Sequence, residues 1–199
     1  HVAHDCVLGD DIRLARVDNG FSLVGRTLDS KDVVSRVLML LASRTVAVAN
    51  AIMLLGLNNH PNEGLPLLRS LFELAAHMRW VCEKDSLRRA EDFLEEHKNP
   101  DWQDLWPSRR LRDRMKELGF GRALEEKALL SCYDHIHANA LGLPWGHVFE
   151  EHRHAGATAE DLLSTTALLM GHVLKSLESR WPGKFPGADE LWDNVRGTR

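Results

Sequence analysis

The sequence predicts an all-α fold, a single-domain antiparallel helical bundle of about five to seven helices. Three observations predict it. Apolar residues recur at helical spacing along several long stretches. Stretches that alternate polar and apolar residues, the pattern of a half-buried strand, are missing. Glycine, proline and asparagine fall between the periodic stretches, where they mark short connections.

The predicted bundle domain covers residues 30–182 of a 199-residue chain, which is long enough for one well-buried core. Residues 1–29 form an irregular or short helical extension, and residues 183–199 form a tail. The first helix is expected to begin at a Ser30 cap and to end near Leu57. Its apolar positions are Val33, Val34, Val37, Leu38, Leu41, Val48, Ile52 and Leu55.

The second predicted helix, Asn62–Lys84, is the one around which the bundle is organised. Asn62 is its predicted N-cap. Only a few residues link it to the first helix, so the two helices must lie antiparallel. Its apolar residues cover more than half of its circumference. Such a helix is normally buried between several neighbours.

One narrow polar stripe interrupts this helix, and it holds Arg69, Glu73 and His77, each four residues from the last. Two readings stay open. The stripe faces water and Arg69 with Glu73 is an ordinary surface ion pair. Alternatively, Trp80 and Pro66 cover the stripe, so that the charges lie in a cleft.

Two shorter, highly charged helices are expected next. The first begins at Asp85 or Ser86, ends near His97, and has an Arg/Glu-rich surface that is predicted to be solvated. The second covers Ser108–Leu118. Its basic run is also read as a solvated face, with a phosphate or an acidic partner as the alternative. The run consists of Arg109, Arg110, Arg112 and Arg114.

A later helix, about Arg122–Leu141, carries two histidines. Helical spacing places His137 in the middle of the apolar arc and turns His135 away from it. A buried imidazole needs a polar partner. Glu73 is the candidate from another helix, and Glu126 and Tyr133 are the alternatives nearer in the sequence.

Glycines and a proline then predict a loop that contains three histidines, His147, His152 and His154, close to two glutamates. The spacing matches no H-E-x-x-H or CxxC pattern, so these histidines are weak metal candidates. No cofactor and no metal site are assigned. The final strong helix is expected to run from a Thr158 cap, with Asp161 completing a capping box, to about Arg180.

Composition restricts the classes of function. A net charge of −4 argues against a general nucleic-acid coat or a binder of anionic membranes, but leaves RNA at a local patch. The three cysteines, Cys6, Cys82 and Cys132, suit free thiols in a reducing compartment. No signal peptide is seen, and the longest apolar run, Thr45–Leu57, is short for a bilayer span. We therefore expect a cytoplasmic protein without a membrane segment. Eighteen arginines against seven lysines favour a bacterial source.

Two motifs resemble a bacterial all-helical family of unknown function. They are LLRSLFE at Leu67–Glu73 and YDHIHANA at Tyr133–Ala140, within a similarity that covers about Ser30 to Leu143. In that family an R-x-x-x-E helix precedes a helix that ends in histidine. The resemblance implies that Arg69, Glu73 and His137 act together.

One departure from the family pattern leaves the matching histidine open. The position four before the histidine is a serine in that pattern, and here it is Tyr133. His135 follows Ser131 by four residues, so His135 is the alternative to His137. The chain is also distantly similar in architecture to HEPN-type helical ribonucleases and toxins. It lacks their R-x(4–6)-H element, because Arg122 lies far before His137.

Three functions follow. The first is a binding or interaction module with a polar Arg-Glu-His cluster, acting on a protein partner or on a second copy. The second is a HEPN-like ribonuclease, toxin or phage-defence protein, with His137 as general acid/base, Glu73 orienting it and Arg69 steadying phosphate charge. The third is a small-molecule or metal binder.

The candidate catalytic residues are therefore Arg69, Glu73 and His137. The candidate binding residues are His77, Trp80, Tyr133, His135 and Trp145. We also expect a homodimer, because long apolar helices in a chain of this size leave one face to share.

Overall fold

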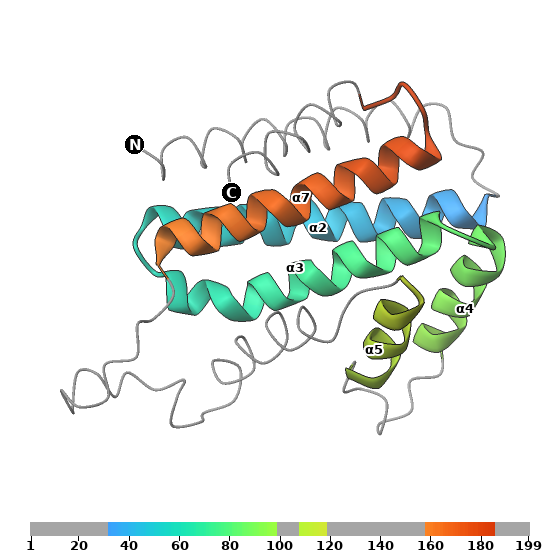
Figure 1. The fold of residues 1–199 in the computed structure, drawn as a ribbon, viewed down its shortest axis with the longest axis horizontal. Coiled ribbons are helices and arrows are strands. Elements are labelled where there is room, and N and C mark those ends of the chain that lie inside the picture. The colour runs from blue at the N-terminus through green and yellow to red at the C-terminus, as the bar shows by residue number, and fades with distance from the viewer. Residues whose placement is uncertain (1–31, 99–107, 119–157, 186–199) are drawn as a thin grey trace.

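The computed structural model describes residues 32–98, 108–118 and 158–185 of the chain, and every element in these ranges is a helix (Figure 1). The helices are α2 (Val33–Leu57), α3 (Pro61–Cys82), α4 (Ser86–Lys98), α5 (Ser108–Glu117) and α7 (Ala159–Arg180). The all-α prediction is confirmed. The predicted N-terminal extension, the helix at about 122–141 and the histidine loop lie outside the described residues.

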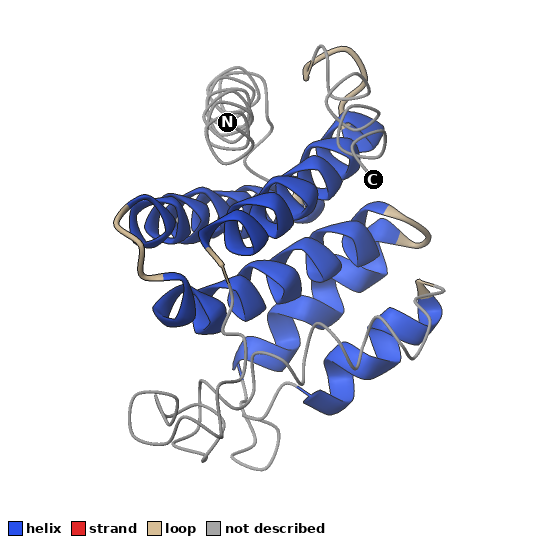
Figure 2. Ribbon diagram, turned by 60° about the vertical axis from the view of Figure 1, so that its left-hand side comes forward, coloured by secondary structure: helices blue, strands red, loops and turns tan. Residues whose placement is uncertain are grey.

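The three long helices α2, α3 and α7 lie side by side and form the centre of the fold (Figures 1 and 2). α2 runs antiparallel to α3, as the short link predicts, and antiparallel to α7, whereas α3 and α7 run in the same direction (Figure 1). The shorter helices pack at the end of the bundle where α2 begins and α3 ends. There α4 contacts α2 and α3, and α5 contacts α3.

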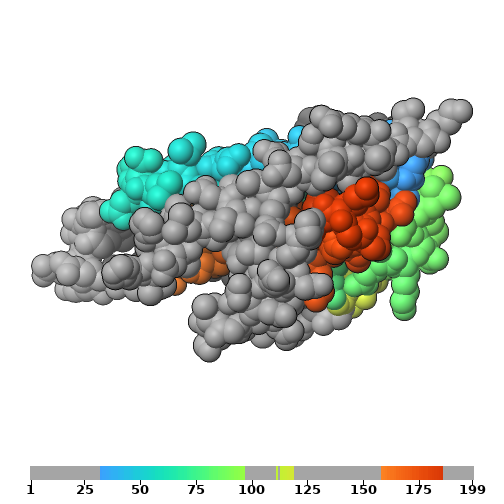
Figure 3. Space-filling view, turned by 90° about the horizontal axis from the view of Figure 1, so that it is seen from above, coloured from blue at the N-terminus to red at the C-terminus, as the bar shows by residue number. Residues whose placement is uncertain are grey.

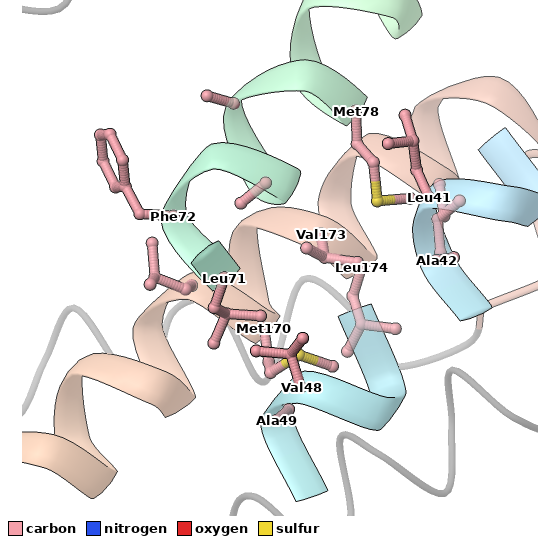
Figure 4. Packing of buried hydrophobic residues seen from close by; sticks show 14 of the residues in the cluster. Leu41, Ala42, Val48, Ala49, Leu71, Phe72, Met78, Met170, Val173 and Leu174 are labelled. Atoms are coloured by element: carbon pink, nitrogen blue, oxygen red, sulfur yellow. The ribbon is translucent and has the colours of Figure 1, made fainter. Parts of the chain in front are cut away.

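The core is formed by apolar side chains that the three long helices direct toward one another. Figure 4 shows Val48 of α2, Leu71 of α3 and Met170 of α7 pointing into the same space. The expected core positions of α2 are buried, apart from Val33 and Leu55, which are half-buried. The largest fully buried side chains are Leu38, Ile52, Leu71, Met78, Leu111, Met115, Leu162, Leu163, Met170, Leu174 and Leu177.

The cap of α2 differs from the predicted Ser30. Asp32 occupies the N-cap, and its Oδ1 accepts a hydrogen bond from the backbone N–H of Val34 at 3.2 Å. Its Oδ2 accepts from Ser35 and from Nη2 of Arg180, the latter at 3.3 Å. One carboxylate therefore caps α2 and holds the end of α7.

The start of α3 also differs from the prediction. His60 occupies the N-cap and makes no side-chain cap hydrogen bond, so Asn62 is not the cap. Pro61 is the first helical residue, where a missing N–H costs nothing because that N–H would have no partner in the helix. Pro66 lies inside the helix.

The start of α7 is the capping box that the sequence predicts. The Thr158 hydroxyl accepts from the backbone N–H of Asp161 at 3.0 Å, and the Asp161 carboxylate accepts from the backbone N–H of Thr158 at 3.1 Å. These hydrogen bonds hold the pKa of Asp161 below its usual range.

α3 and α7 approach each other closely at Gly64. A Cβ atom added to Gly64 would lie 2.5 Å from Cδ2 of Leu162. The absence of a side chain at this position lets the two parallel helices pack in contact.

α2 is long and apolar enough to cross a membrane by length and composition alone. Half of its most apolar window is buried inside the structure, against its neighbouring helices. A core helix passes the same test, so the cytoplasmic location inferred from the sequence stays a prediction.

Candidate functional site

The polar stripe of α3 does not face bulk water, so the second of the two readings left open by the sequence describes its burial better. Arg69 and Trp80 are buried, with 9% and 5% of their surface exposed. Glu73 and His77 are half-buried. The stripe is therefore a partly covered row of polar groups on one face of α3.

Arg69 and Glu73 form an ion pair within α3. Nε of Arg69 donates to Oε1 of Glu73 at 3.1 Å, and the two side chains are 10% and 20% exposed. Burial raises the pKa of the Glu73 carboxyl, and the hydrogen bond and charge of Arg69 offset only part of that effect. Glu73 thus accepts a proton more readily than an exposed glutamate does.

His77 is held by a residue of α5. Nη1 of Arg114 lies 2.9 Å from Nδ1 of His77. A guanidinium group can only donate, so Nδ1 must be the unprotonated nitrogen that accepts this hydrogen bond. The imidazole also packs edge to face against the ring of Phe93, with 5.6 Å between the two ring centroids. The stripe therefore takes part in the docking of both α4 and α5.

Trp80 lies at the centre of a second polar group, which we call the Trp80 cluster and which comprises Trp80, Arg89, Glu96, Arg114 and Glu117. The guanidinium groups of Arg89 and Arg114 lie 4.9 and 4.4 Å from its ring centroid. Such contacts between cations and aromatic rings gain strength when they are buried.

Hydrogen bonds connect the members of the Trp80 cluster. Nε1 of Trp80 donates to Oε2 of Glu117 at 2.8 Å, and Nη2 of Arg89 donates to the same oxygen at 3.1 Å. Nη1 of Arg89 donates to the backbone carbonyl of Trp80 at 2.6 Å. Nη2 of Arg114 donates to Oε2 of Glu96 at 2.5 Å. The cluster joins α3, α4 and α5.

Sequence reasoning predicted only Trp80 of this cluster. Arg89 and Arg114 belong to surfaces predicted to be solvated, but only 6% and 5% of their surface is exposed. Helical spacing contains the missing signal. Arg114 lies between the buried Leu111 and Leu118, three and four residues away, and Arg89 lies four residues before Phe93. The side chains of Arg109, Arg110 and Arg112 lie outside the described part.

The remaining predicted site residues cannot be placed. Tyr133, His135, His137, Trp145, His147, His152 and His154 all lie outside the described residues. The association of Glu73 with His137 therefore stays a prediction. Within ranges 32–98, 108–118 and 158–185, no group of three or more His, Cys, Asp or Glu side chains could hold a metal ion. The loop histidines stay weak metal candidates.

Cys82 lies at the end of α3 as a free thiol. Burial raises the pKa of this thiol to about 12. A thiol with this pKa is almost entirely protonated at neutral pH, and only the thiolate is a nucleophile, so Cys82 is not an activated cysteine.

Comparison with known proteins gives one match. Residues 35–129 match a family described as "Family of unknown function (DUF5677)", a range that holds the R-x-x-x-E pair of α3 and ends before His135 and His137. No curated protein and no solved structure matches the chain. Over slightly less than half of its length, the chain is thus similar to an uncharacterised family, and its described part is helical.

Proposed function

We propose that this protein is a binding or interaction module, and that the polar stripe of α3 stabilises the bundle instead of performing catalysis. One observation supports this proposal: the stripe side chains are held by partners within the chain. Arg69 pairs with Glu73, and His77 with Arg114. Trp80 donates to Glu117.

A catalytic acid or base must come within hydrogen-bond reach of a substrate proton. Nδ1 of His77 is instead engaged by the buried guanidinium group of Arg114, which is itself bonded to Glu96. Breaking these contacts would weaken the attachment of α5 to α3 and α4, which Glu117 also bonds. We assign His137 the same structural role, as a buried imidazole with Glu73 as its acceptor.

A second candidate is a ribonuclease similar to the HEPN-type proteins, with a role as a toxin or in phage defence. The raised pKa of Glu73 favours it, because a perturbed carboxyl beside a cation is typical of acid/base sites that handle phosphate. In this candidate His137 is the general acid/base, Glu73 orients it and Arg69 binds the phosphate.

The two candidates differ in what His137→Ala does. If the protein is a binding module, the purified wild type cleaves a mixed-sequence RNA no faster than a blank. In that case His137→Ala lowers the free energy of unfolding in urea by about 1–3 kcal/mol. The matched control His135→Ala, on the outward side of the same predicted helix, leaves it unchanged. RNA cleavage that is lost in a His137→Ala variant of unchanged stability would overturn the proposal.

A further inference from the structure

One face of α2 is exposed although it carries large apolar side chains. Leu40, Leu54 and Leu57 are 65%, 63% and 56% exposed, in a helix whose opposite face is buried against its neighbours. Figure 3 shows part of α2, in blue to cyan, at the molecular surface. The exposed residues share an arc of about 140° on the helix. They are Arg36, Leu40, Ser43, Arg44, Ala47, Asn50, Leu54 and Leu57.

The apolar members of this arc form a straight seam. Leu40, Ala47 and Leu54 follow one another at intervals of seven residues, the spacing that lines up side chains along a helix–helix contact. The seam is also symmetric about Ala47, since a leucine lies seven residues to either side. A seam that is symmetric in this way can pack against an identical helix that runs in the opposite direction, related to the first by a two-fold axis.

We propose that α2 pairs antiparallel with α2 of a second copy of this chain, with the two-fold axis at Ala47. In this register Leu40 meets the partner's Leu54, and the small Ala47 side chains meet on the axis, where the helices approach most closely. Arg44 falls opposite the partner's Asn50, whose carboxamide oxygen can accept a hydrogen bond from the guanidinium group.

The charges on this face select the antiparallel direction. α2 contains Arg36 and Arg44 but no acidic residue. A parallel pair would set each arginine against its own copy. The antiparallel pair places the two Arg44 residues about 9 Å apart along the axis and the two Arg36 residues about 33 Å apart. It also aligns the helix dipoles favourably.

Polar residues within the arc favour a second copy over a lipid surface as the occupant. Ser43 and Asn50 lie on the same side as the leucines and are exposed. In a hydrocarbon environment the Asn50 carboxamide would lose its hydrogen-bond partners, which is costly. In the antiparallel pair it faces Arg44 of the second copy.

Sedimentation velocity of the full chain across a concentration series tests the interface. The wild type is expected to dimerise, and Leu54→Glu is expected to raise the dissociation constant by about 100-fold, because the symmetry places two introduced carboxylates, one from each chain, in the apolar interface. Leu87→Glu is the matched control. Leu87 is 56% exposed but lies on α4, so this variant should dimerise like the wild type. Circular dichroism checks that both variants are folded.

Cross-linking with a short bismaleimide tests the register. Ala47→Cys should link two chains, whereas Ser43→Cys should not, because the two copies of position 43 lie about 12 Å apart along the axis. The wild type, treated alike, accounts for Cys6, Cys82 and Cys132. Equal linking through both positions would overturn the register. A wild type that stays monomeric, or a dimer insensitive to Leu54→Glu, would overturn the interface. Co-flotation of monomeric protein with phosphatidylcholine–phosphatidylglycerol vesicles would also overturn the interface, because that result would mean that this face of α2 binds lipid.

Discussion

The guanidinium group of Arg114 lies 4.4 Å from the ring centroid of Trp80, and both side chains are buried. This contact explains how α5 is stabilised. α5 has ten residues, most of them charged, and a helix of that length is marginal on its own in water. Arg114 also bonds His77 and Glu96, so a single side chain attaches α5 to both α3 and α4.

Replacing Arg114 should therefore destabilise the fold. In Arg114→Met the aliphatic stem is kept, but Glu96 loses its ion pair with Arg114 and His77 loses its hydrogen bond with Arg114. We expect the free energy of unfolding in urea to fall by about 3 kcal/mol. Arg88→Met is the control, because the Arg88 ion pairs are exposed, and it should change stability by less than about 0.5 kcal/mol. Equal effects of the two variants would contradict the role given to Arg114.

The pH dependence of stability should report the environment of Glu73. Burial raises the folded-state pKa of Glu73 above its unfolded value of 4.5. The folded state therefore binds the proton more tightly, and protonation of Glu73 stabilises the fold. This contribution is fully present below pH 4.5 and is lost as the pH rises through the folded-state pKa.

The measurement is the difference in unfolding free energy between wild type and Glu73→Gln at several pH values. The unfolding free energy of the wild type, relative to that of Glu73→Gln, should increase as the pH falls toward 4.5. The same measurement on wild type and Glu91→Gln, at an exposed glutamate of α4, provides the control. A difference for Glu73 that moves against the wild type on acidification would show that the pKa is lowered.

Gly64→Ala should destabilise the contact between α3 and α7. Alanine favours a helix over glycine by about 1 kcal/mol, but the added Cβ would lie 2.5 Å from Leu162. Overpacking of this kind costs about 1–3 kcal/mol, so we expect a net loss in chemical denaturation. Asn62→Ala, at an exposed position of the same helix, should be close to neutral. A stabilised Gly64→Ala variant would contradict this expectation, because it would mean that the Leu162 side chain moves aside for the added methyl group.

Cys82 should resist alkylation in the folded protein. Its pKa is raised from 9.0 to about 12, which lowers the thiolate fraction at pH 8 by about 1,000-fold. Iodoacetamide labelling, read by mass spectrometry of the Cys82 peptide, should be slower by about that factor than labelling in urea. Labelling at equal rates in both solvents would show that the thiol is exposed.

The long helices were predictable because their signal is local. Leu38, Leu71 and Leu174 repeat at helical spacing within their own segments, and all three are buried. The capping box of Thr158 and Asp161 is contained in four residues. The cap of α2 was predicted two residues too early, at Ser30, because two residues near that end, Ser30 and Asp32, are suitable caps. The structure uses Asp32, whose carboxylate also binds Arg180, 148 residues away.

The Trp80 cluster was harder to predict because its energetics are not local. A charged residue such as Arg89 or Arg114 is normally exposed, and its burial here depends on an aromatic ring from another helix. The spacing of Arg114 relative to Leu111 and Leu118 shows which way it points, but not what it meets. The predicted contact between Glu73 and His137 remains a prediction, because His137 lies outside the described residues.

The central claim, that the α3 stripe stabilises the bundle, is tested most directly by a double-mutant cycle on Arg69 and Glu73. Unfolding free energies are measured for Arg69→Met, Glu73→Gln and the double variant. A parallel cycle on Arg79 and Glu83 has the same i,i+4 geometry and the same 3.1 Å contact, but its side chains are 35% exposed.

We expect Arg69→Met to cost about 2 kcal/mol, with a coupling energy to Glu73 above 1 kcal/mol, because it leaves the mostly buried Glu73 carboxylate without its cation. The Arg79–Glu83 coupling should be roughly 0.3–0.5 kcal/mol. If Arg69→Met and Glu73→Gln both unfold like the wild type, the stripe contributes nothing to stability, and the structural role proposed for it is contradicted.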